Sequence, residues 1–428
     1  MLSRWLTDRR FLPLCLILFV VLRLGVALLF PVTPVSDSAF YVDRAREMVA
    51  GLGYQEQGHP TAYWPVGYPA LLAGGYWLTG SMPLTIIALN LAAGLATFWL
   101  LGVIGRRVSI PAAGIGFAQL ALTLYPNHIT YTGQALSEVV YTALILGGMA
   151  LMLRGPRLAN LALAGLVLGF ATYVKAQTTA FPLGVLIAMA LLERANRRWL
   201  LLAGGALLYA VMFATVLPWS LRNAEQLGHF VLVSTNGGPT LLDGNNDIAD
   251  GGSTNMYANP ALKPLIDSLP VPFEDRIARQ VEWDQATRAA ARAWIADNPG
   301  QFAALLPRKA LKLWLVDGEG FWAHEGQYTA HATVLKGLRI ANQGFYGLIL
   351  LLALPGLWAG LAGWLRGDPA RAPLLYLSLF AVFTTLVCMA FSGQIRYHFP
   401  AMPFLMLAGG WTLMRRSGGL AGGGDRPI

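Results

Sequence analysis

The chain has 428 residues, of which 55% are hydrophobic and only 12% are charged, and its mean hydropathy is +0.52. Soluble domains carry roughly 25% charged residues, so this composition excludes an ordinary soluble enzyme and indicates a membrane protein. The net charge of +9 does not require a nucleic-acid partner, because the basic residues form short clusters between apolar runs, where they orient a chain in a bilayer. Cys15 and Cys388 both lie in apolar runs and have neither a disulfide nor a metal-binding spacing.

The first apolar run, residues 11–30, follows a basic N-terminus. It is longer than the roughly 7–15 residues of a secretory signal core and is not followed by a small-residue cleavage site, so we expect a retained span. Arg23 lies inside this run. Its side chain either has a function within the membrane or extends to the outer surface near Phe30.

The next stretch, residues 35–48, carries charges in an otherwise charge-poor chain. It predicts a short surface helix that begins near Asp37 and is terminated at Gly51. Asp37, Tyr41 and Arg44 are four and seven residues apart and therefore share one face of this helix. Asp37 either only caps the helix or supplies a reactive carboxylate.

Nine further apolar runs bring the number of predicted spans to ten. They are residues 83–104, 111–126, 137–153, 158–174, 178–193, 199–218, 345–365, 373–391 and 397–414. Residues 66–82, which include Tyr68, are too short to cross and predict a second surface or re-entrant helix. The predicted fold is an all-α polytopic membrane protein with about ten transmembrane helices, outer surface helices and one large outer loop.

Lysine and arginine clusters mark alternate loops of this topology. The clusters are Arg106-Arg107, Arg154 with Arg157, Arg194 with Arg197 and Arg198, Arg366 with Arg371, and Arg415-Arg416. This is the positive-inside pattern, and it predicts that both termini are cytoplasmic. The intervening loops then lie on the opposite, periplasmic face.

We expect three parts along the chain. Residues 1–218 form a membrane domain whose first outer loop, 31–82, carries Asp37. Residues 219–344 form a large periplasmic loop with an amphipathic helix at 274–298 and an interfacial helix at 302–316. Residues 345–428 provide the last spans and a short cytoplasmic tail.

Five outer loops place ionic side chains on one face of the membrane. These are Asp37, Glu138, Lys175, Arg222 and Arg396. A carboxylate can take a proton from an acceptor hydroxyl, and cations can stabilise the charge on a departing phosphate. Each cation taken singly is equally consistent with contact to lipid headgroups.

Several motifs together resemble a known family. They are Asp37 with Tyr41, Gly51-Leu-Gly-Tyr54, Pro65-Val-Gly-Tyr-Pro69, Gly133-Gln-Ala-Leu-Ser-Glu138, Pro218-Trp-Ser-Leu-Arg-Asn223, Ser234-Thr-Asn-Gly-Gly238, Gly244-Asn-Asn246 and Arg396-Tyr-His-Phe-Pro400. In order and spacing they resemble the bacterial polyprenyl-phosphate-sugar glycosyltransferases of the GT-C superfamily, which are relatives of the protein O-mannosyltransferases (family 39) and the lipid A aminoarabinose transferases. The resemblance covers nearly the whole chain.

The resemblance implies roles for particular residues. Asp37 is the expected catalytic base and Glu138 a second acid, while Arg222 and Arg396 are candidates for binding the donor phosphate. Tyr41, Arg44, Tyr68 and Tyr397 are expected to line the substrate site.

The chain departs from the family pattern at two positions. Ser38 follows Asp37 where many relatives have Glu. Trp64 lies near the position where the aminoarabinose transferases have Lys, so phosphate binding is expected to involve Lys175, and aminoarabinose is not supported as the transferred sugar.

The sequence thus predicts an inverting glycosyltransferase of the bacterial inner membrane. Its expected partners are a polyprenyl-phosphate sugar donor, the bilayer, and a lipid, glycan or protein acceptor, with no nucleic acid. No cofactor is required; a divalent metal is compatible with the site, although no ligand cluster calls for one. A transporter of lipid-linked sugars and a non-catalytic scaffold of an envelope-polysaccharide complex remain alternatives.

Overall fold

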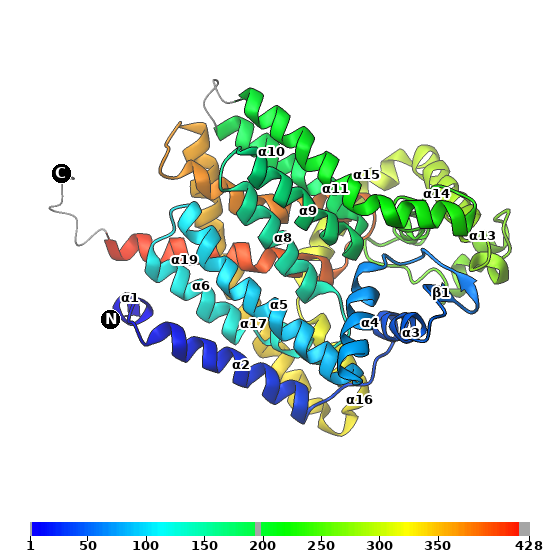
Figure 1. Cartoon of the computed structure of the whole chain (residues 1–428), viewed down its shortest axis with the longest axis horizontal. Coiled ribbons are helices and arrows are strands. Elements are labelled where there is room, and N and C mark those ends of the chain that lie inside the picture. The colour runs from blue at the N-terminus through cyan, green and yellow to red at the C-terminus, as the bar shows by residue number, and fades with distance from the viewer. Residues whose placement is uncertain (1, 193–197, 419–428) are drawn as a thin grey trace.

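The computed structural model describes residues 2–192 and 198–418. Long helices pack side by side through most of this part of the chain (Figure 1). The strands found there are two short ones, β1 (Gln55–Glu56) and β2 (His59–Pro60), which pair as a small antiparallel ribbon. The predicted all-α polytopic class is confirmed. Two residues of the third basic cluster, Arg194 and Arg197, lie outside the described residues.

The membrane-type helices are α2 (Phe11–Leu29), α5 (Met82–Arg107), α6 (Ala112–Leu124), α8 (Glu138–Met152), α9 (Leu158–Val174), α10 (Phe181–Leu192), α11 (Arg198–Leu227), α17 (Ala332–Leu365), α18 (Leu379–Ala390) and α19 (Met402–Gly418). Shorter or surface helices are α1 (Leu2–Leu6), α3 (Asp37–Val49), α4 (Gly67–Thr79), α7 (Pro126–Thr130), α12 (Gly237–Asp243), α13 (Lys263–Asp267), α14 (Gln280–Asp297), α15 (Pro299–Leu315) and α16 (Trp322–Gln327). Short 3₁₀ turns used below are η1 (Tyr131–Gly133), η2 (Ala176–Ala180), η6 (Glu319–Phe321), η7 (Thr329–His331) and η9 (Ile395–Ala401).

Each of the ten predicted spans coincides with one of these membrane-type helices. By length and composition, five helical stretches among the described residues are able to cross a membrane, and the bent pair Pro126–Gly133 with Glu138–Met152 adds a sixth. Three others, Ala112–Leu124, Leu158–Val174 and Ala176–Leu192, are apolar but shorter. Ten complete crossings therefore stay a prediction, whereas a multi-pass membrane protein is confirmed.

The break between α6 and α8 leaves backbone carbonyls without helical partners inside an apolar surrounding, where such groups must be satisfied internally. Arg23, which is completely buried, donates to the carbonyls of Leu122 and Thr123 at 2.8 and 3.2 Å. Asn90 Nδ2 donates to three carbonyls between Tyr131 and Gln134. Arg23 thus neither extends to the surface nor faces a cavity; it caps a broken helix.

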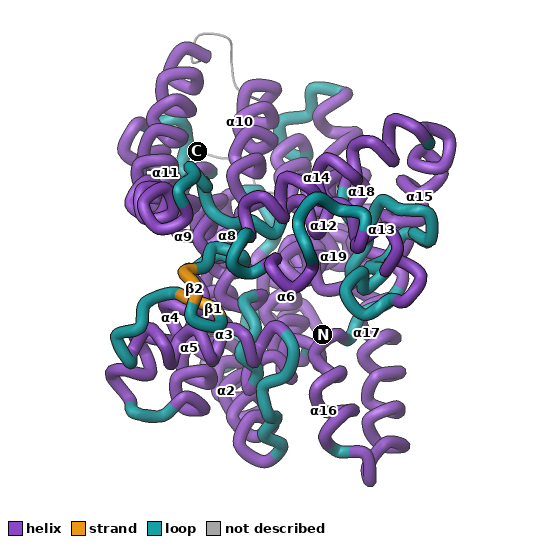
Figure 2. Tube along the Cα trace, turned by 90° about the vertical axis from the view of Figure 1, so that its right-hand side faces the viewer, coloured by secondary structure: helices purple, strands orange, loops and turns teal. Residues whose placement is uncertain are grey.

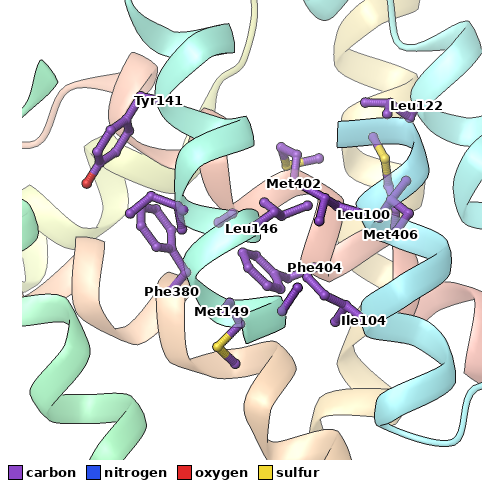
Figure 3. Close-up of a cluster of buried hydrophobic side chains, with 14 of the residues drawn as sticks. Leu100, Ile104, Leu122, Tyr141, Leu146, Met149, Phe380, Met402, Phe404 and Met406 are labelled. Carbon is purple, nitrogen blue, oxygen red and sulfur yellow. The ribbon is translucent and has the colours of Figure 1, made fainter. Parts of the chain in front are cut away.

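Close packing in the membrane part depends on small residues and a sulfur-rich core. A Cβ atom on Gly114 of α6 would lie 2.8 Å from the Gly410 carbonyl oxygen of α19, so the two backbones touch. Figure 3 shows the adjoining core, in which side chains of α5, α8, α18 and α19 interdigitate. Because this core is continuous, the ends of its helices hold the loops above it in fixed positions.

A separate polar lobe is formed by α12, α13 and α14, which lie beside α3 and β1 at the end of the molecule opposite α1 (Figures 1 and 2). Its small core centres on Trp283, which is 1% exposed. The predicted amphipathic helices at 274–298 and 302–316 correspond to α14 and α15. The lobe therefore covers the end of the bundle where the first outer loop lies.

Candidate functional site

An ion pair between Asp37 and Arg396 joins the first outer loop to the last one. Asp37 is the first residue of α3, and Arg396 lies in η9, just before α19. The Asp37 carboxylate accepts a hydrogen bond from this guanidinium. Both side chains are 20% exposed. Asp37 therefore does more than cap a helix.

A cavity of about 210 Å³ opens at this pair. We name it the Asp37 pocket; its polar lining residues are Ser36, Asp37, Ser38, Gln134, Glu319, Gln394 and Arg396. Glu319, from η6, was missed in the sequence because it lies in the long 219–344 segment without a recognisable motif. Burial raises the pKa of the Glu319 carboxyl, and Arg396 opposes that rise. The pocket thus holds two carboxylates and one guanidinium.

A second ion pair, Lys175 with Glu138, lies at 3.1 Å where two other helices end. Glu138 is the first residue of α8, and Lys175 directly follows α9. Glu138 is 2% exposed, and its second carboxylate oxygen has no hydrogen-bond partner among the described residues. Glu138 is therefore placed to hold Lys175 in position rather than to contact a substrate itself.

Lys175 lines a larger cavity of about 410 Å³, the Lys175 pocket. Tyr41, Trp64, Tyr397 and Arg288 also line it. The Lys175 ammonium lies 5.5 Å from the centre of the Tyr397 ring. Aromatic faces beside cations suit a sugar that carries an anionic group.

An apolar groove of about 830 Å³ adjoins the Lys175 pocket at Val174, which lines both. Its walls come from α4, α5, α8, α9 and α11, and we name it the α5–α9 groove. Its lining includes Leu71, Leu89, Leu144, Phe170 and Trp219. The groove is of the size and character that accept a hydrocarbon ligand.

Four predicted site residues do not line these cavities, namely Glu138 and the three that follow. Arg222 donates to the carbonyl oxygens of Thr61 and Tyr54 at 2.8 and 2.7 Å and so fixes the first outer loop. Arg44 pairs with Glu47 at 2.8 Å. Tyr68 is 1% exposed and packs behind Tyr41, with ring centres 5.4 Å apart. Of the predicted residues, Tyr41 and Tyr397 do line the Lys175 pocket.

Beneath the Asp37 pocket lies a buried network centred on Asp317. Its carboxylate accepts hydrogen bonds from Tyr125, Asn127 and Asn342 at 2.8, 2.6 and 2.9 Å. His398 Nε2 lies 3.0 Å from it. Asp317 precedes Glu319 by two residues and His398 follows Arg396 by two, so the network holds both walls of the pocket.

No group of three His, Cys, Asp or Glu side chains that could hold a metal ion occurs in residues 2–192 and 198–418. In the Asp37 pocket one of the two carboxylates is already paired with Arg396.

Comparisons with known proteins identify the fold. No family model matches the chain, and no curated protein matches it. The oligosaccharyltransferase of Archaeoglobus fulgidus, solved with Zn and sulfate, superposes with a TM-score of 0.54 at 13% identity, covering 94% of this chain and 49% of that chain. The same enzyme tethered to an acceptor peptide containing the NVT sequon gives 0.55 at 10% identity, over 97% and 51%. The present chain thus spans about half the length of these neighbours.

A further neighbour is ArnT from Cupriavidus metallidurans bound to undecaprenyl phosphate. It gives a TM-score of 0.43 at 17% identity, covering 96% of this chain and 78% of that chain. The two superpositions with TM-scores above 0.5 show that the chain has the fold of the archaeal oligosaccharyltransferase, which is the GT-C type that the sequence motifs predict.

Proposed function

We propose that this GT-C-type chain is a glycosyltransferase that moves one sugar from a polyprenyl-phosphate donor to an acceptor hydroxyl, with inversion at the anomeric carbon. The reaction would take place on the periplasmic face of a bacterial inner membrane, with both termini in the cytoplasm. One observation carries the proposal: the Asp37–Arg396 pair lines one cavity, and Tyr397, the residue after Arg396, lines a second cavity that adjoins an apolar groove.

We assign the donor to the Lys175 pocket and the apolar groove beside it. Its polyprenyl chain would occupy the α5–α9 groove, which ends at Val174, and its phosphate would then reach the adjacent Lys175. The sugar would lie in the Lys175 pocket between Tyr41, Trp64 and Tyr397. Arg396, next to Tyr397, would contact the same phosphate with its Nη2, since Nη1 pairs with Asp37 and Nε donates to Gln394.

The acceptor is assigned to the Asp37 pocket. Asp37 would remove the proton of the acceptor hydroxyl, and the resulting oxygen would attack the anomeric carbon. The bond from that carbon to the phosphate oxygen breaks, and its electron pair stays on the phosphate, where Lys175 and Arg396 stabilise the added charge. Attack from the side opposite the leaving group inverts the anomeric carbon.

The archaeal neighbour was solved with zinc. Here the Asp37 pocket offers Asp37 and Glu319, and an arginine already neutralises the first of them. The residues present do not make a metal site, so no step of the proposal passes through a metal.

The decisive experiment uses the purified protein in vesicles with a synthetic polyprenyl-phosphate hexose. We expect release of free polyprenyl phosphate when an acceptor is present, and a loss of that release in Asp37→Asn. Consumption of a nucleotide sugar in place of the lipid-linked donor would refute the proposal. Movement of the intact lipid-linked sugar across the vesicle membrane without release would instead establish a transporter.

A further inference from the structure

A second apolar groove, of about 510 Å³, lies between α2 and α17. We name it the α2–α17 groove; its lining residues are Val26, Phe30, Pro126, Ile129, Thr130, Phe321, His324, Tyr328, His331, Val334, Leu335 and Leu338. His324 is among these side chains, and burial lowers the pKa of its imidazole, so the ring adds no charge at neutral pH. Nothing in the proposed donor path uses this groove.

Exposed apolar side chains border the groove at the ends of two membrane-type helices. The groove lies at the C-terminal end of α2 and the N-terminal end of α17, two helical stretches able to cross a membrane. Its surroundings are apolar and exposed: Leu29 is 73% exposed and Val334 61%. An exposed apolar surface on spanning helices is covered by lipid. The hydrocarbon chains of membrane lipids therefore have direct access to the groove.

The same groove shares a wall with the Asp37 pocket. Glu319 and Trp322 face the pocket, whereas Phe321 and His324, from the same short stretch of chain, face the groove. The segment that carries these residues is hydrogen-bonded to the loop before Asp37. The Tyr328 hydroxyl and Gln327 Nε2 donate to the Pro31 carbonyl oxygen at 2.7 and 3.0 Å. The groove and the Asp37 pocket therefore lie on two sides of one short segment.

We propose that the α2–α17 groove binds the hydrocarbon chain of the acceptor, which is a membrane lipid with a hydroxyl in its head group. This inference rests on the proposed function and names its acceptor class. The α5–α9 groove and the α2–α17 groove adjoin different cavities, one with Lys175 and one with Asp37. Two lipids would enter from different sides of the bundle and bring their head groups together at the Asp37–Arg396 pair.

The test follows the transferred sugar. The full-length protein is reconstituted in vesicles of a total bacterial inner-membrane lipid extract, with added membrane proteins and soluble glycans, and is given polyprenyl-phosphate hexose labelled in the sugar. We expect free polyprenyl phosphate to be released and the label to appear in an organic-extractable lipid. Release with the label in protein or in a water-soluble glycan refutes the lipid acceptor while leaving the glycosyltransferase intact. Absence of any release refutes the proposed function itself.

A matched pair of variants on α17 tests the groove. Leu335→Trp fills it, whereas Ile340→Trp adds the same side chain to an exposed position of the same helix that does not line it. We expect Leu335→Trp to lower label transfer to lipid by about tenfold or more, with slow hydrolysis of the donor by water unchanged, and Ile340→Trp to resemble the wild type. If Leu335→Trp does not accumulate in membranes, Leu338→Phe makes the same test with a smaller change. Equal transfer by the groove variant and its control overturns the assignment.

Discussion

Two acid–base pairs use the same short turn, η9, and differ in almost every physical respect. Arg396 pairs with Asp37, and both side chains are 20% exposed at the wall of a cavity. His398, two residues later, contacts Asp317, and these side chains are 0% and 2% exposed. The Asp317 carboxylate has four polar partners, whereas the Asp37 carboxylate pairs with Arg396. We therefore expect the first pair to exchange partners with a substrate, and the second to hold the turn in place.

The largest expected effect is on Asp37→Asn. If Asp37 is the base, transfer should fall by about 10²–10⁴-fold, because the amide cannot accept the proton. Thermal unfolding should change little, because the side chain is partly exposed and retains its shape. Asp43→Asn, at an exposed position of the same helix, is the matched control and should keep its activity. Near wild-type transfer in Asp37→Asn would remove the base and with it the contrast between the two pairs.

Arg396→Ala should have the next largest effect. Loss of a charge-assisted hydrogen bond to the donor phosphate corresponds to roughly 1.5–3 kcal/mol, or about 10- to 150-fold in donor use. Release of polyprenyl phosphate at varied donor concentration measures it, and Arg279→Ala, on an exposed position at the start of α14, serves as the control. A change in stability alone, without a change in donor use, would place Arg396 with the structural pair.

Asp317→Asn, unlike Asp37→Asn, should lower the stability of the protein. An amide nitrogen would replace one acceptor oxygen and face donors such as Tyr125 or Asn127, which leaves buried groups unsatisfied. Each such group costs about 1–3 kcal/mol, so we expect a lower midpoint of thermal unfolding. Asp267→Asn, in an exposed pair with Lys263, should leave the midpoint unchanged. If Asp317→Asn melts like the wild type, the network does not support the turn.

These contrasts explain what the sequence predicted well. Charge alternation between apolar runs depends only on local composition, and it placed Asp37, Glu138, Lys175 and Arg396 on one face, where the structure pairs them. The all-helical class followed from the apolar runs in the same way. Both properties can be read from short segments of the sequence, without knowing which segments contact one another.

Other features depend on contacts between distant segments and had no local signal. Glu319 reaches the Asp37 pocket because the Asp317 network binds residues 125–127, 342 and 398 together. Arg222 looked like a phosphate ligand, yet its guanidinium is hydrogen-bonded to two carbonyls of the first outer loop. The number of full crossings was also beyond reach, because the kink between Pro126 and Glu138 turns the chain by 114° within an apolar region.

Arg222→Ala tests whether Arg222 has a structural role or binds the donor phosphate. Its hydrogen bonds to Thr61 and Tyr54 should contribute about 1 kcal/mol net, because the side chain is half-buried. We expect a modest fall in the unfolding midpoint and unchanged dependence of the rate on donor concentration. A rise in the donor concentration needed for half-maximal rate, as in Arg396→Ala, would return Arg222 to the phosphate site.

The smallest effect, for which only the direction is predicted, concerns the second carboxylate of the Asp37 pocket. Burial raises the pKa of Glu319, Glu138 and Asp37 act in the same direction, and Arg396 and Arg339 oppose it. Because the folded pKa lies above the unfolded value, Glu319 contributes stability that is fully present below the unfolded pKa and is lost as pH rises through the folded pKa. The unfolding midpoint of the wild type relative to Glu319→Gln should therefore fall as pH is raised from about 4 towards neutrality.

Unfolding midpoints of both proteins over that pH range measure this difference, and Glu282→Gln, at a more exposed position on α14, should show no such trend. A difference that instead grows with pH would mean that Arg396 stabilises the Glu319 carboxylate more than burial disfavours it. Arg396 would then be shared between two carboxylates of the pocket, and less of its charge would be free for a donor phosphate. The pH dependence of this one variant thus tests whether the Asp37–Arg396 pair is the exchangeable one.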